Sequence, residues 1–150
     1  MPIMVPYDDS PLAATALERA AVLGEAFDCG VRAVTIVPEG QSYAREKGWI
    51  GPDEAFDRGT ITDRLRMGVE DVVQDAEIDV RHVADRLPKG DVARRLRHAA
   101  DEMGTELVCI GSENAGRIMT PLSSVGGGVA SDTGYEVYLV RETESTILRE

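Results

Sequence analysis

The sequence contains little lysine, few aromatic residues and only two cysteines. Fourteen of its sixteen basic residues are arginine, and Asp and Glu outnumber Lys and Arg by 27 to 16, which gives a net charge of −11. So large an acidic excess argues against a nonspecific electrostatic grip on nucleic acid or on an anionic membrane. We therefore expect neither nucleic acid nor a membrane as a partner.

The two cysteines, Cys29 and Cys109, lie far apart in apolar surroundings, without a CxxC pair or a neighbouring histidine to complete a metal set. We expect both to be buried, reduced thiols. The first ten residues lack the features of a signal peptide, and no apolar run approaches the ~18 residues of a membrane span. These absences predict a cytoplasmic protein.

The acidic composition with little lysine has two interpretations. It is typical of a halophilic protein dissolved in concentrated salt, where a Debye length near ~3 Å at 1 M screens the repulsion among carboxylates. It is also compatible with an ordinary acidic cytosolic protein. The composition leaves both interpretations open.

Apolar segments alternate with amphipathic helical segments along the whole chain. Strands are expected over 2–7, 31–37, 78–84, 106–111 and 135–141, and helices over 11–29, 60–76, 91–103 and from about 124. Five strands separated by four helices predict an α/β fold, with one domain over residues 1–150. Its core would be a doubly wound, five-stranded parallel sheet with helices on both faces. The alternating pattern of 78–84 indicates a strand at the sheet edge.

Several residues mark the expected helix ends. Ser10 is a good N-terminal cap for the first helix, and Gly30 is expected to end it. Thr60 and Asp63 have capping-box spacing at the start of the second helix. Residues 38–59, which include the only tryptophan, show no periodicity. A stretch of that length inside a compact domain indicates a lid or a mobile insert.

In open parallel sheets, ligands bind beyond the carboxyl ends of the strands, where the strand order reverses. This rule points to residues 6–10 after the first strand and 111–125 after the fourth. Because Ser10 already caps the helix, the Asp8 carboxylate can hold a ligand, although a solvated or backbone-bonded loop residue is the alternative. The later segment is rich in Gly and Ser, so it predicts either an anion site at a helix N-terminus or ordinary loop glycines.

The sequence contains no motif that indicates a catalytic centre. There is no GxGxxG motif of dinucleotide-binding proteins, and no Ser-His-Asp or Cys-His set is suggested. His82 and His98 are expected on a strand and on a helix, away from both candidate segments. We therefore expect both histidines to be structural, and we name no catalytic residue.

The order of these segments resembles the universal stress protein family over nearly the whole chain. The similar stretches are MVPYDDS at the first strand and turn, GDVARRL and ELVCIGS at the third helix and fourth strand, and SSVGGGVASDTGYEVYLVR at the end. The resemblance implies a stress-response regulatory protein and not an enzyme. It also implies a homodimer paired through the last strand, with a signalling partner of unknown identity.

The resemblance further implies a nucleotide site. Family members that bind ATP carry Gly-x2-Gly-x9-Gly-Ser/Thr after the fourth strand, and their first-loop aspartate contacts adenine. Carried over to this chain, the cofactor-binding positions are Pro6, Asp8, Ile36, Gly111, Ser112, Asn114, Ser123, Ser124 and Val125. The implied ligand is ATP or AMP, with Mg²⁺ only in the company of a bound nucleotide.

The chain departs from that signature in its phosphate loop. Asn114 and Ser123 replace two glycines, the interval between them is one residue short, and Glu113 stands where many nucleotide binders have histidine. A carboxylate ~4 Å from a phosphate charge costs on the order of 4 kcal/mol at an effective dielectric near 20. The resemblance therefore implies weak adenine-nucleotide binding or none. An adenylate-forming or nucleotide-hydrolysing enzyme of the related fold, and a sensor of another small anion, are the alternatives.

Overall fold

The computed structural model describes residues 2–84, 90–112 and 134–143. Its elements are β1 (Ile3–Pro6), α1 (Pro11–Phe27), β2 (Val31–Pro38), α2 (Gln41–Glu46), α3 (Arg58–Val72), β3 (Glu77–Val83), α4 (Asp91–Met103), β4 (Leu107–Gly111) and β5 (Glu136–Val140). The strands form one parallel sheet in the order β3-β2-β1-β4-β5. The predicted α/β fold with a five-stranded parallel sheet is confirmed, and β3 lies at an edge as expected.

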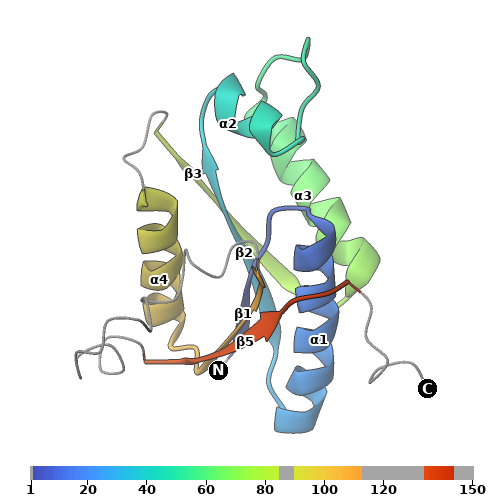
Figure 1. Cartoon of the computed structure of the whole chain (residues 1–150), viewed down its shortest axis with the longest axis vertical. Helices are drawn as coiled ribbons and strands as arrows, with labels where there is room; N and C mark the ends of the chain where they lie inside the picture. Colours follow the sequence, from blue (N-terminus) through green and yellow to red (C-terminus); the bar gives the residue numbers. More distant parts are fainter. Residues whose placement is uncertain (1, 85–89, 113–133, 144–150) are drawn as a thin grey trace.

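The sheet is doubly wound. The chain adds β2 and β3 on one side of β1 and then returns to place β4 and β5 on the other side, so the order reverses between β1 and β4. Figure 1 shows α1 and α3 together on one side of the sheet and α4 on the other. The expectation of helices on both faces is thereby confirmed. The segment expected to form a helix from about residue 124 lies outside the described residues.

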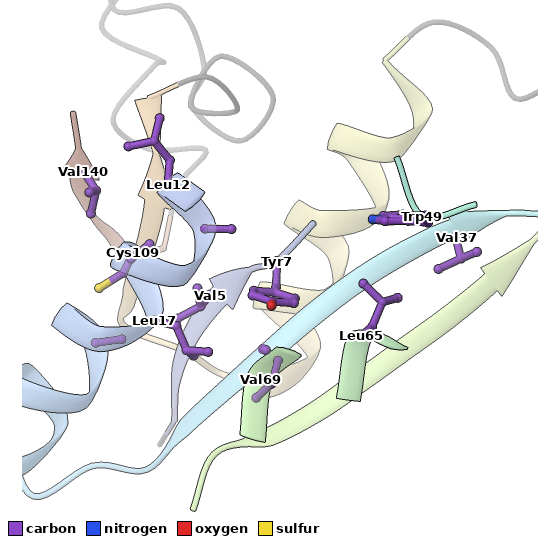
Figure 2. Close-up of a cluster of buried hydrophobic side chains, with 14 of the residues drawn as sticks. Val5, Tyr7, Leu12, Leu17, Val37, Trp49, Leu65, Val69, Cys109 and Val140 are labelled. Carbon is purple, nitrogen blue, oxygen red and sulfur yellow. The ribbon is translucent and has the colours of Figure 1, made fainter. Parts of the chain in front are cut away.

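Strand alternation divides the core between the two faces. Ile3 and Val5 of β1 belong to the cluster under α1 and α3, whereas Met4 between them belongs to the cluster under α4. Figure 2 shows the first cluster, in which Leu17 of α1 and Leu65 of α3 meet the strands. Both leucines are fully buried, and burial of each stabilises the fold by roughly 1.5–3 kcal/mol.

The first helix begins as predicted and ends two residues early. Ser10 Oγ accepts a hydrogen bond from the Ala13 N–H at 3.2 Å. The last helical residue is Phe27, and the C-cap is Asp28, which adopts the left-handed conformation with φ 56°, so the expected end at Gly30 is wrong. Gly24 explains the early turn, because a Cβ there would lie 2.6 Å from the Cys29 carbonyl oxygen. Only glycine at that position lets the chain fold back so closely.

Helix α3, the second of the helices expected from the sequence, begins earlier than its sequence signal indicates. Its cap is Asp57, whose Oδ2 accepts the Thr60 backbone N–H at 3.0 Å, so the predicted capping box of Thr60 and Asp63 is wrong. The hydrogen bonds from Thr60 lower the pKa of the Asp57 carboxyl. A carboxylate three residues before Thr60 is a sufficient cap by itself. The helix ends at Val72, four residues before the predicted end.

Residues 38–59 are more ordered than the sequence indicates. They contain α2, with Ala44 fully buried, and Trp49 is only 3% exposed. A helix of six residues is too short to display a helical period, so sequence patterning could not detect it.

The two cysteines differ in burial. Cys109 is buried, and this burial raises the pKa of its thiol to about 12. Cys29 is only partly buried, so the expectation of two buried thiols is right for Cys109 and wrong for Cys29. Cys29 follows directly after the Asp28 turn at the end of α1, where the chain reaches the surface.

Candidate functional site

A pocket lies at the carboxyl ends of β1 and β2, on the side of the sheet that α4 covers. It holds about 340 Å³ of empty space, part of which is open to solvent. Its walls come from the loop after β1, from β2, from α2 with the residues that follow it, and from α4. The lining residues are Pro6, Tyr7, Asp8, Val34, Thr35, Ile36, Tyr43, Lys47, Trp49, Val92 and Leu96.

Asp8 and Lys47 are the two charged residues in this lining. Asp8 Oδ2 accepts a hydrogen bond from Lys47 Nζ at 3.0 Å, and Asp8 Oδ1 accepts the Ser10 backbone N–H at 3.2 Å. The side chains of Lys47 and Asp8 are 17% and 16% exposed. The pair is therefore partly shielded from water, which strengthens the attraction between its members compared with a surface ion pair.

Trp49 ties the loop after β1 to the segment that follows α2. Its indole Nε1 donates to the Asp8 carbonyl oxygen at 2.9 Å, and its own carbonyl oxygen accepts from Arg64 at 2.9 Å. Arg64 in turn donates from Nε to Asp9 Oδ2 at 3.2 Å. Together these bonds fix the Asp8 backbone from α3 and from residues 47–49. The segment expected to be a lid or a mobile insert is thus a wall of the pocket.

Tyr7 is buried beneath the loop after β1 and links it to α3. Its hydroxyl donates to Asp9 Oδ1 at 3.0 Å. Burial and the Asp9 carboxylate raise the pKa of Tyr7 well above its ordinary value, so the hydroxyl stays protonated and serves as a donor. The Tyr7 hydroxyl packs against α3 at Gly68. Only a glycine fits there, because a Cβ at this position would lie 2.4 Å from the Tyr7 hydroxyl oxygen. The Thr35 hydroxyl donates a hydrogen bond to the Tyr7 carbonyl oxygen at 2.6 Å.

Three of the predicted site residues line the pocket, namely Pro6, Asp8 and Ile36. Gly111 and Ser112 lie at the end of β4, which pairs with β1, but they do not line this pocket. Gly111 has a packing role, since a Cβ there would lie 2.9 Å from the Cβ of Leu12 in α1. The remaining predicted positions, Asn114, Ser123, Ser124 and Val125, lie outside the described residues, as does Glu113.

Besides Ile36 and the predicted segment 6–10, the pocket is lined by seven residues that sequence reasoning missed: Val34, Thr35, Tyr43, Lys47, Trp49, Val92 and Leu96. Two signals were present in the chain. Trp49 is the only tryptophan, and Lys47 is one of two lysines, four residues after Tyr43. Residues four apart share one face of a helix, and the Lys47 Nζ lies 5.8 Å from the Tyr43 ring centroid. What the sequence lacked was any indication that this short segment is helical.

Both histidines lie away from the pocket. His82 Nε2 is 2.9 Å from the Thr62 hydroxyl oxygen on α3, and His98 pairs with Glu102 along α4. Across 2–84, 90–112 and 134–143, no three His, Cys, Asp or Glu residues come together as a metal site. None of the helices in those same ranges is long and apolar enough to cross a membrane.

The chain matches the universal stress protein family over residues 1–141. A search of curated proteins finds no match to it. Among solved structures it is similar to a universal stress protein in complex with cAMP, with 20% identity, a TM-score of 0.55, and coverage of 96% of this chain and 98% of that one. It is also similar to the universal stress protein from Archaeoglobus fulgidus in complex with dAMP, with 19% identity, a TM-score of 0.56, and 94% and 98% coverage.

A third similar structure is a universal stress protein family member from Burkholderia pseudomallei, with 20% identity, a TM-score of 0.53, and coverage of 93% of this chain and 95% of that one. At these identities the likeness to solved structures establishes the fold. The family match spans nearly the whole sequence and agrees with that fold. The chain therefore belongs to the universal stress protein family.

Proposed function

We propose that this universal stress protein is a regulator and not an enzyme, and that its pocket binds an adenine nucleotide such as AMP or ATP weakly. The observation that carries the proposal is the pocket itself, with apolar walls and one carboxylate–ammonium pair. Two structures of the same fold were solved with adenine nucleotides, cAMP and dAMP. Any Mg²⁺ would arrive with the nucleotide.

The lining suits a flat base with a polar edge. Pro6 and Ile36 on the sheet, with Leu96 on α4, offer apolar surface for the faces of a base. The Asp8 carboxylate can accept a hydrogen bond from an exocyclic amino group. Binding is expected to be weak, because both Asp8 oxygens already accept hydrogen bonds, from Lys47 and from the Ser10 N–H, so a ligand must share or displace them.

Isothermal titration of the full chain with AMP and with ATP and Mg²⁺, in dilute buffer and in concentrated KCl, tests the proposal. Asp8→Asn should weaken AMP binding roughly tenfold or more, since it removes a charged hydrogen-bond acceptor while keeping the side-chain shape. The matched control is Asp75→Asn, which removes the same charge from an exposed turn and should leave binding unchanged.

Three outcomes would contradict the proposal. The first is that neither nucleotide produces heat or a thermal shift with the wild-type protein. The second is that inorganic phosphate binds as tightly as AMP and binds better after Asp8→Asn, which would favour the sensor of a small anion. The third is release of pyrophosphate or inorganic phosphate from ATP, which would favour the enzyme of the related fold.

We also propose that the protein is a homodimer paired through β5. Among the described strands β5 has β4 as its only neighbour, and Tyr138 and Leu139 on it are 38% and 40% exposed. An exposed strand edge with apolar side chains is a template for pairing with a second chain. Sedimentation equilibrium should give twice the chain mass, and Leu139→Asp should shift it toward monomer. Val22→Asp, on the exposed surface of α1, is the control, and a monomeric wild type would overturn this proposal.

A further inference from the structure

We propose that Lys47 is a specificity-determining residue of the pocket, and that it recognises a ring-nitrogen acceptor on the edge of the base beside the amino group that Asp8 recognises. This inference rests on the proposed nucleotide function and names the chemical class that the site accepts. That class is a heteroaromatic base carrying a hydrogen-bond acceptor next to a hydrogen-bond donor.

Lys47 is held in position at both ends. Its backbone N–H donates to the Tyr43 carbonyl oxygen at 3.0 Å at the end of α2. Its Nζ donates to Asp8 Oδ2 at 3.0 Å and lies 5.8 Å from the Tyr43 ring centroid. Two residues later, Trp49 is bonded to the Asp8 carbonyl oxygen. The ammonium group is therefore held by two contacts of its own, to Asp8 and to the Tyr43 ring, while the backbone bond of Lys47 fixes the base of its side chain and the Trp49 bond fixes Asp8.

The pair presents two complementary hydrogen-bonding groups side by side. An ammonium group has three N–H donors, so the bond to Asp8 leaves donor capacity that a ligand can use. The Asp8 carboxylate only accepts hydrogen bonds. A base edge with a ring nitrogen next to an exocyclic amino group, as in adenine, matches both groups. Asp8 without Lys47 would recognise the amino group and would not distinguish a ring nitrogen from a ring C–H.

Partial burial makes this recognition selective. Because the Lys47 and Asp8 side chains are 17% and 16% exposed, water replaces a missing ligand contact poorly. A hydrogen bond from a charged donor in such surroundings changes affinity by roughly tenfold to a hundredfold. Two ligands that differ only in this acceptor should therefore differ measurably in affinity.

The experiment compares AMP with 1-deaza-AMP, in which the N1 ring nitrogen is replaced by C–H and the amino group is kept. The wild-type protein should bind 1-deaza-AMP roughly tenfold or more weakly than AMP. Lys47→Met removes the ammonium and keeps an apolar stem, so it should bind the two ligands equally. Arg45→Met is the matched control, because Arg45 lies on α2 two residues before Lys47, is exposed and does not line the pocket. It should discriminate as the wild type does.

Two results would overturn the inference while leaving the nucleotide site intact. One is a wild type that binds AMP and 1-deaza-AMP equally, a comparison that needs no variant. The other is a Lys47→Met protein that still discriminates between them. If the wild type does not bind AMP at all, the proposed function fails and the inference fails with it. Because Lys47→Met leaves Asp8 without its ammonium partner, the neutral pair Asp8→Asn with Lys47→Met serves as a second variant, and it should also show no discrimination.

Discussion

In the part of the chain that the structure describes, the two faces of the sheet are packed differently. On the face that α1 and α3 cover, eighteen buried residues form one cluster, whereas the described residues contribute eight to the cluster beneath α4. The pocket lies on the α4 side, where Val92 and Leu96 stand opposite β2. The comparison indicates that one face supplies most of the described core and that the pocket opens on the other. Tyr7 and Trp49 connect the two, because they belong to the first cluster and also line the pocket.

Truncating one leucine on each face should give the largest effect. Leu65 of α3 is fully buried in the cluster between the sheet, α1 and α3. Leu65→Ala should lower the free energy of unfolding by roughly 3–5 kcal/mol, because it leaves a cavity in close-packed surroundings. Leu96→Ala, on the pocket wall, should cost less, about 2 kcal/mol, since Leu96 already borders empty space. Urea unfolding of both variants measures the difference. Equal losses would show that the α4 face is packed as tightly as the other.

Alanine substitutions at two glycines of α3 should have smaller effects on stability, and the two effects should have opposite signs. Gly68→Ala should lower stability by about 1–3 kcal/mol, because its Cβ would meet the Tyr7 hydroxyl at 2.4 Å and Asp9 Oδ1 at 2.7 Å. Gly59→Ala meets only Asp57 Oδ2 at 3.8 Å, so the better helix propensity of alanine should raise stability by up to about 1 kcal/mol. Thermal unfolding followed by circular dichroism compares them. Stabilisation by both substitutions would contradict the close contact between α3 and the loop after β1.

Most of the fold could be predicted from the sequence because its signals are local. Strand alternation and apolar runs identified all five strands, and the βαβ order implied a parallel sheet. The helix ends were harder. The Asp28 turn depends on the close approach of Gly24 to the Cys29 carbonyl, a contact that no propensity describes. Asp57 and Thr60 both carry capping chemistry, and only the path of the chain decides between them.

The site was predictable in part for the same reason. Asp8 follows the first strand directly, so the rule for parallel sheets located it from the sequence, and Pro6 and Ile36 follow from the resemblance. Lys47 reaches Asp8 from 39 residues away, and the bond from Trp49 to Asp8 spans 41 residues. Such contacts depend on how the connection between β2 and α3 folds back over the sheet. The sequence of that connection has no period long enough to reveal it.

The burial of Trp49 has a practical consequence. It is the only tryptophan in the chain, it lies in the pocket wall, and its indole N–H is bonded to the Asp8 carbonyl oxygen. Tryptophan fluorescence of the whole protein therefore originates from one indole beside the space where a ligand would bind. The molecule contains its own optical reporter, and filling of the pocket can be followed through emission intensity and wavelength without any attached label.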